Sequence, residues 1–176
     1  PVFVVHPEMG SIKRILCPID FSEWSREALR SSLEFGRRLG ARVSVLNVMV
    51  ERPHYPHLSE VKIPVEDPWL MFGAVQSPDR SDAARIKSRQ DRLAAFVSDT
   101  FNPGVTVARR VIKANSAPEG ILSVSQEEDA DLVIMGSSGG GDAVQPLLGN
   151  TTEKVSRRLP CSFMSVRSPR LPQLSP

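Results

Sequence analysis

The sequence predicts a single α/β domain built on a doubly wound parallel sheet with helices on both faces. Short apolar runs, which suit buried strands, alternate along the chain with stretches of helical periodicity. The length of 176 residues fits one domain, which usually takes roughly 100 to 200 residues. Hydrophobic residues make up 40% and charged residues 24%, so wholesale disorder and coiled coil are excluded.

The first half of the chain predicts two strands around one helix. Residues 13–19 form an apolar run that stops at Asp20. Ser22 then supplies the N-cap of a helix whose apolar residues recur at helical spacing up to Gly40, the expected helix stop. Residues 42–50 are apolar and β-branched without a helical period, and they predict a second buried strand.

Prolines crowd the segment from 51 to 78, where they remove backbone donors and fix φ. This segment is expected to be a long loop or insertion, and binding of a protein partner is one function that it could have. His54 and His57 inside it have a spacing that suits metal ligands, but no carboxylate or cysteine accompanies them closely. We therefore expect a surface loop and no metal site there.

The second half of the chain continues the alternation of helices and strands. The expected elements are a helix over 79–101, a strand over 105–112, a helix from the capping-box sequence at 116–119 to about 128, a strand over 131–135, a helix over 151–159 and a strand over 161–166. One domain over 1–176 results, with a core over 12–167 and a C-terminal tail over 168–176.

Charge and cysteine content exclude several classes of function. The net charge is +2 with no block of like charge, so nucleic acid is not an expected partner. The apolar stretch 2–5 is too short for a membrane span. Cys17 and Cys161 sit in separate apolar runs and are expected to be buried and unpaired. The chain should be soluble and cytoplasmic.

The glycine-rich loop after the fourth strand suggests three sites. Residues 136–140 fit the G-x-S-x-G nucleophile elbow, but no histidine follows them, as a hydrolase triad would need. Residues 138–143 resemble the phosphate loop of the ATP pyrophosphatases, which follows the first strand in that family. No Walker A or G-x-G-x-x-G sequence occurs.

The third pattern in this loop suits a phosphate site. Gly136-x-x-Gly139 is followed after nine residues by Gly149, which opens a helix. Glycines let backbone N–H groups approach an anion, and a helix start adds unpaired donors and a favourable dipole. The alternative is a surface loop without a ligand.

The chain resembles the universal stress protein family over roughly residues 12–167. The resemblance rests on PIDFS at 18–22, on DLVIMGSSG at 131–139, and on the G-2X-G-9X-G pattern followed by a hydroxyl-rich turn. It implies a Rossmann-like, adenine-nucleotide-binding domain, usually a homodimer paired through its fifth strand. With it we expect five parallel strands in the order 3-2-1-4-5.

The resemblance also implies roles for individual residues around the base and ribose. Pro18 and Ile19 would line the adenine pocket, and Val48 would contact adenine through its backbone. Asp20 would lie by the ribose and, indirectly, by Mg²⁺ bound to the phosphates.

Further residues would surround the ribose and the phosphates. Met135, Gly136 and Gly139 would wrap them. The donors to the phosphates would be Gly149, Asn150, Thr151 and Thr152.

The chain departs from the family pattern at three places. Asn150 stands where nucleotide-binding members carry Ser or Thr, and its amide still donates, with a different reach. Asn47 stands where histidine is common, and Cys161-Ser162-Phe163 replaces the usual Cys-Pro-Val.

Two functions follow from these residues. The first is a stress-response or regulatory dimer that binds ATP, AMP or ADP, with Mg²⁺, at the loops after strands one and four. The second is a nucleotide-free interaction module that acts through the insertion at 51–78 and the edge of strand five. No residue is evidently a base for activating water, so an enzyme is not expected, although slow ATP hydrolysis is compatible with Asp20 and a metal.

Overall fold

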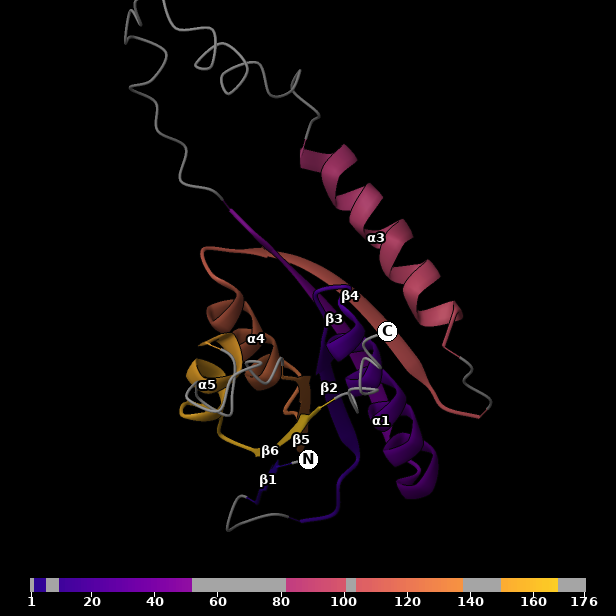
Figure 1. The fold of residues 1–176 in the computed structure, drawn as a ribbon, viewed down its shortest axis with the longest axis vertical. Helices are drawn as coiled ribbons and strands as arrows, with labels where there is room; N and C mark the ends of the chain where they lie inside the picture. Colours follow the sequence, from indigo (N-terminus) through magenta and orange to yellow (C-terminus); the bar gives the residue numbers. More distant parts are fainter. Residues whose placement is uncertain (1, 6–9, 52–81, 101–103, 138–149, 168–176) are drawn as a thin grey trace, which may run out of the picture.

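The computed structural model describes residues 2–5, 10–51, 82–100, 104–137 and 150–167. Its strands are β1 (Val2–Val4), β2 (Arg14–Pro18), β3 (Arg42–Val50), β4 (Val107–Ala114), β5 (Leu132–Gly136) and β6 (Ser162–Val166). They form one sheet in the order β1-β6-β5-β2-β3-β4 (Figure 1). The five strands from β2 to β6 are parallel, and their order along the sheet confirms the prediction.

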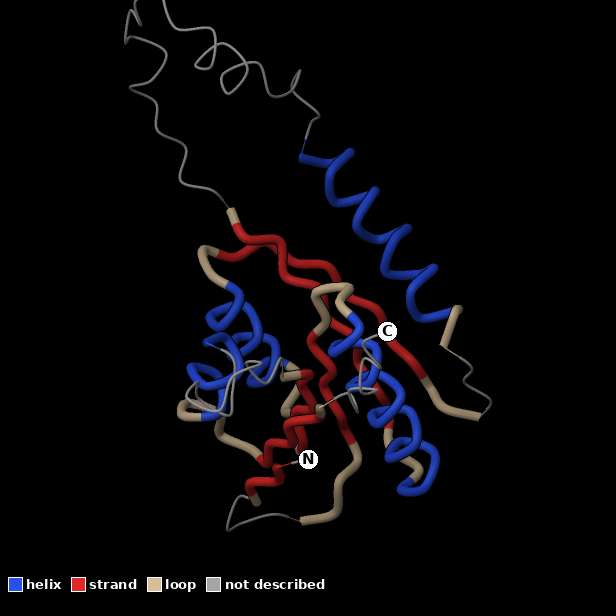
Figure 2. Tube along the Cα trace, in the orientation of Figure 1, coloured by secondary structure: helices blue, strands red, loops and turns tan. Residues whose placement is uncertain are grey.

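Helices cover both faces of this sheet, as Figure 2 shows. The helices are α1 (Glu23–Leu39), α3 (Asp82–Ser98), α4 (Ala117–Glu127) and α5 (Asn150–Ser156). Apolar residues of α1 and α3 form one buried cluster with one face of the strands, and residues of α4 and α5 form a second cluster with the other face. Successive strand residues alternate between the two clusters, as the pleat requires: Ile134 of β5 joins the first and Val133 the second.

The helix ends follow the local sequence signals. Ser22 is the N-cap of α1 and accepts a hydrogen bond from the Ser25 N–H, while Gly40 ends the helix with φ at 64°. Ser116 caps α4 in the same way, through the Glu119 N–H. These three cap positions agree with the sequence prediction.

Helix α3 is the element that differs most from its prediction. It is described from Asp82 to Ser98, and the remaining residues of the predicted range 79–101 either lie outside it or outside the described residues. Its buried residues, Leu93, Phe96 and Val97, all come from its last two turns. The first half of α3 is mostly exposed, so the buried residues of the helix are confined to its carboxyl-terminal end.

The strand β1 was not predicted from the sequence. It pairs antiparallel with β6, with Val4 opposite Phe163. The expected homodimer would place a second copy against this edge of β6, where β1 now lies. A second copy must therefore meet β1 or displace it.

Other expectations have plainer outcomes. Cys17 and Cys161 are free, and β5 lies between β2, which contains Cys17, and β6, which follows Cys161. Cys17 is buried as expected, whereas Cys161 is only half-buried because it lies just outside the strand. The insertion from residue 52 onward, with His54 and His57, and the tail at 168–176 lie outside the described residues. Within the described ranges, no helix has the length and apolarity needed to cross a membrane.

Candidate functional site

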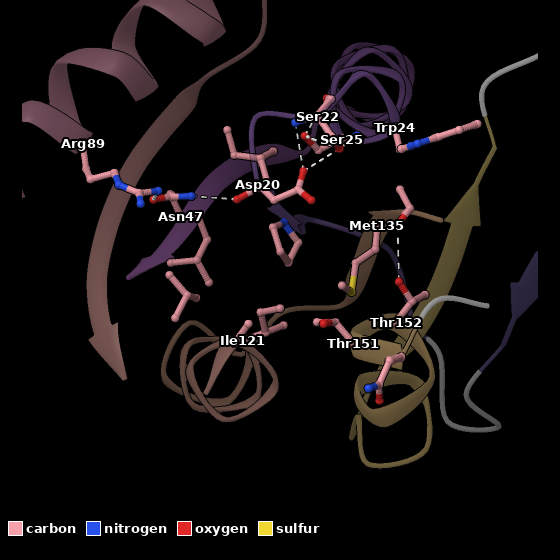
Figure 3. A pocket seen from close by; sticks show the side chains of 17 residues that line it. Asp20, Ser22, Trp24, Ser25, Asn47, Arg89, Ile121, Met135, Thr151 and Thr152 are labelled. Carbon is pink, nitrogen blue, oxygen red and sulfur yellow. Dashed lines mark hydrogen bonds between the residues drawn. The ribbon is translucent and has the colours of Figure 1, made fainter. Parts of the chain in front are cut away.

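A pocket opens at the carboxyl ends of β2, β3 and β5, which is where doubly wound sheets bind ligands (Figure 3). Its volume of about 330 Å³ falls within the range of small-molecule sites, roughly 300 to 1,000 Å³. The lining residues are Pro18, Ile19, Asp20, Ser22, Trp24, Ser25, Leu46, Asn47, Val48, Arg89, Ala117, Ile121, Met135, Gly136, Asn150, Thr151 and Thr152.

The structure brings together nine of the eleven residues that the sequence analysis selected. These are Pro18, Ile19, Asp20, Val48, Met135, Gly136, Asn150, Thr151 and Thr152. They come from four separate elements and meet in one cavity. Gly139 and Gly149 lie outside the described residues.

A tight turn between β2 and α1 positions Asp20. Phe21 adopts a left-handed φ of 68°, which costs a non-glycine residue about 1 kcal/mol or more. The Phe21 ring packs edge-on against Phe96 of α3, with the ring centroids 5.6 Å apart, and Arg92 lies over its face. Packing by α3 therefore holds the strained turn that directs Asp20 toward the pocket.

Hydrogen bonds keep the Asp20 carboxylate charged. Ser22 donates to Oδ1 from its backbone N–H, at 3.0 Å, and from its hydroxyl, at 2.5 Å. Burial raises the pKa of the carboxyl, but the hydrogen bonds from Ser22 and Ser25 outweigh burial, so the pKa of Asp20 lies below its ordinary value. Asp20 is thus an anion and a hydrogen-bond acceptor at neutral pH.

The β5 side of the pocket is built on close backbone contacts. A Cβ added to Gly136 would lie 2.4 Å from the carbonyl carbon and oxygen of Trp24 in α1. The Thr152 hydroxyl of α5 donates to the Gly136 carbonyl at 3.3 Å and is buried. Gly136 therefore serves the contact between β5 and α1, and the proton of Thr152 is already used within the protein.

The β3 side contains two polar residues that the family pattern did not select. Asn47, 2% exposed, donates from Nδ2 to the Ile19 carbonyl at 2.9 Å. Arg89 of α3 donates to the Asn47 Oδ1 at 3.4 Å. In the sequence, Asn47 differs from the family pattern without any sign of its role, and no periodicity distinguishes Arg89 from the other arginines of α3.

The described residues contain no group of three His, Cys, Asp or Glu side chains that could hold a metal ion. Asp20 is the one carboxylate in the described lining of the pocket. Magnesium prefers one or two carboxylates together with phosphate oxygens and waters. The donor set therefore fits a metal carried by a nucleotide and does not form a separate metal site.

Comparison with known proteins places the chain among universal stress proteins. A universal stress protein of Methanocaldococcus jannaschii is 23% identical over 159 residues, covering 90% of this chain and 84% of the relative. The solved structure of a second universal stress protein of that organism covers 92% of this chain and 100% of its own, with a TM-score of 0.60 and 23% identity.

Two further solved structures contain nucleotides. One is a universal stress protein in complex with cAMP, with a TM-score of 0.58, 14% identity, and coverage of 90% of this chain and 98% of its own. The other, from Archaeoglobus fulgidus in complex with dAMP, has a TM-score of 0.57, 14% identity and coverage of 88% and 96%. The family model for universal stress proteins matches residues 11–167. This chain belongs to the universal stress protein family.

Proposed function

We propose that the chain binds an adenine nucleotide, ATP or its mono- or diphosphate, in the pocket at the ends of β2, β3 and β5. The observation that carries the proposal is the convergence of the nine predicted residues on one cavity. The solved relatives that contain cAMP and dAMP support the ligand class. The proposal includes a dimer whose conformation or choice of partner changes when the nucleotide binds.

The proposed orientation places the base at the β3 side. The Leu46 carbonyl accepts from the Ile19 N–H at 2.8 Å, so the Leu46 backbone faces β2. Backbone groups of a strand alternate between its two neighbours, and Val48 therefore faces the same way, beyond the end of β2. Its N–H and C=O suit a base edge that presents an acceptor beside an amino donor, as adenine does.

The phosphates would then lie at the β5 side. Asn150 and Thr151 line the cavity there, at the start of α5, and offer an amide and a hydroxyl. Thr152 would contribute its backbone N–H, because its hydroxyl donates to Gly136. Asp20 lies between the two sides (Figure 3). Magnesium bound to the nucleotide would supply the positive charge that a carboxylate and phosphates need in order to be neighbours.

We propose binding, and not fast catalysis, as the role of this site. Asp20 has a lowered pKa and two hydrogen bonds from Ser22, which makes it a weak base.

We also propose a cytoplasmic location for the chain, because the free state of both cysteines fits a reducing compartment.

The proposed homodimer needs its own test because β1 occupies the edge of β6. Light scattering on the chain with and without residues 1–5 separates two arrangements. A dimer that survives the deletion pairs through β6, and one that is lost with it depends on β1.

Calorimetric titration with ATP and Mg²⁺ tests nucleotide binding. Ala117 lines the pocket at the first turn of α4, and Ala117→Trp should fill the cavity and abolish the heat. Ser123→Trp, on an exposed position of the same helix, should bind as the parent does. No heat from the parent at high micromolar nucleotide would leave the interaction-module function, with deletion of 53–78 as its test.

A further inference from the structure

Arg89 is the one positively charged side chain in the described lining of the pocket. It reaches from α3 toward Asn47, on the side of the cavity away from Thr152 (Figure 3). Its charge is not neutralised locally, because no carboxylate of the described residues forms an ion pair with it. Its guanidinium carbon Cζ lies over the Phe21 ring, 5.8 Å from the ring centroid. A cation at this place needs an explanation that the binding pattern does not supply.

Two hydrogen bonds through the buried amide of Asn47 fix the position of Arg89. Asn47 lies on β3 and uses both ends of its amide: Nδ2 donates to Ile19 at 2.9 Å, and Oδ1 accepts from Arg89 at 3.4 Å. Because the amide is 2% exposed, turning it would leave the Ile19 carbonyl without its donor. The end of β2 thus orients the guanidinium through Asn47.

The chemistry of this arrangement selects acceptors. A guanidinium has five N–H donors and no acceptor, and one donor is used on Asn47. The Asn47 Oδ1 and the Ile19 and Leu46 carbonyls each accept one hydrogen bond already, from Arg89, from Asn47 and from the Ile19 N–H. The remaining donors of Arg89 therefore suit an acceptor atom of a ligand.

We propose that Arg89 recognises the nucleobase by donating a hydrogen bond to a ring nitrogen of a purine bound beside Val48 and Ile121. The inference rests on the proposed nucleotide function and adds the residue that sets base selectivity. Purine ring nitrogens are acceptors, and Val48 accounts for one edge of the base, so Arg89 takes a ring nitrogen that Val48 leaves free. Asn47 acts as its positioning residue.

The alternative role for Arg89 is a contact with phosphate in a ligand bound the other way round. Adenosine and ATP separate the two roles because they share the base and differ in charge. A base contact predicts that Arg89→Met weakens both ligands by the same factor, about tenfold. A phosphate contact predicts a loss for ATP with adenosine unchanged, and that result would overturn the proposal.

Purine analogues that lack one ring nitrogen test the contact itself. Val48 and Arg89 would each use one ring nitrogen, so the parent chain should bind two of 1-deaza-, 3-deaza- and 7-deazaadenosine about tenfold more weakly than adenosine. Arg89→Met should bind one of these two analogues as tightly as it binds adenosine, and it should keep the parent's loss for the other, which lacks the nitrogen that Val48 uses. Arg85→Met removes the same charge from an exposed position of α3 outside the pocket, and it should keep the parent's pattern.

Failure of the Arg89 role and failure of nucleotide binding give different experimental results. If the parent binds adenosine and all three analogues keep the same relative affinity in the parent and in Arg89→Met, the role of Arg89 is wrong and nucleotide binding stands. If the parent binds neither adenosine nor ATP, the nucleotide function fails and this inference fails with it. Unfolding by urea, measured on each variant, verifies that the fold is kept.

Discussion

The two sides of the pocket are built in different ways. On the β5 side, Gly136 touches the backbone of α1 and Thr152 is tied to the Gly136 carbonyl. On the β3 side, two polar side chains, Asn47 and Arg89, are joined by hydrogen bonds. A position in close contact with backbone accepts few residue types, whereas positions joined by side-chain hydrogen bonds can accept several. The glycine pattern therefore reports the shape of the site, and the base selectivity that we propose comes from the opposite side.

The largest effect is expected on the β5 side, from Gly136→Ala. The added Cβ would lie 2.4 Å from backbone atoms of Trp24, which cannot move without shifting α1. We expect a loss of about 3 kcal/mol in the free energy of unfolding, measured by urea denaturation. Gly10→Ala is the control, because nothing lies within 4 Å of its Cβ, and it should change stability little. Equal stability of the two variants would contradict the close contact.

The next effect is on the β3 side, from Asn47→Leu. Removing the buried amide leaves the Ile19 carbonyl without its donor, and we expect a loss of about 2 kcal/mol in the free energy of unfolding. Asn47→His keeps a side-chain donor and should lose less. If the leucine and histidine variants unfold at the same urea concentration, the hydrogen bond to Ile19 contributes nothing to stability.

A smaller effect is expected from Thr152→Val, which removes one hydroxyl at nearly constant volume. The lost hydrogen bond to the Gly136 carbonyl should lower the free energy of unfolding by about 1 kcal/mol. Thr151→Val, next to it and only half-buried, is the matched control and has no such bond to lose among the described residues. A greater loss from Thr151→Val than from Thr152→Val would reverse the assignment.

The smallest effect is the pH dependence from Asp20, which lies between the two sides. Its pKa is lowered in the folded state, so its stabilising contribution is present above the unfolded pKa, about 3.9, and is lost as pH falls through the folded pKa. The stability difference between the parent and Asp20→Asn should be constant at neutral pH and shrink in acid. A difference that grows on acidification would contradict the lowered pKa.

Much of the fold could be predicted because local signals and the global architecture agree. Ser22, Gly40 and Ser116 fix helix ends through their own chemistry, and the strands β3 and β5 are apolar runs without helical period. The strand β1 could not be predicted in the same way. Three apolar residues have no recognisable pattern, and their strand conformation comes from pairing with β6.

Some residues of the candidate site could also be predicted from the sequence, and others could not. Asp20 and Gly136 could be selected because each directly follows an apolar run of the sequence, within a recognisable pattern. Arg89 could not be selected, since its place in the pocket depends on how α3 packs over Phe21 through Phe96. The sequence predicts Thr152 as a donor to the phosphates, but its hydroxyl donates to the Gly136 carbonyl and so holds α5 to the end of β5.

Binding of an adenine nucleotide across both sides of the pocket is the central claim. Amide and side-chain N–H resonances measured during titration with AMP test it most directly. A nucleotide bound across both sides should cause saturable shifts at Val48 and the Asn47 side chain on one side and at Gly136 and Thr151 on the other. Asp131, at the opposite end of β5, should be unaffected. Shifts confined to Asp131 and its neighbours, or no shifts at millimolar AMP, would show that AMP does not bind in this pocket.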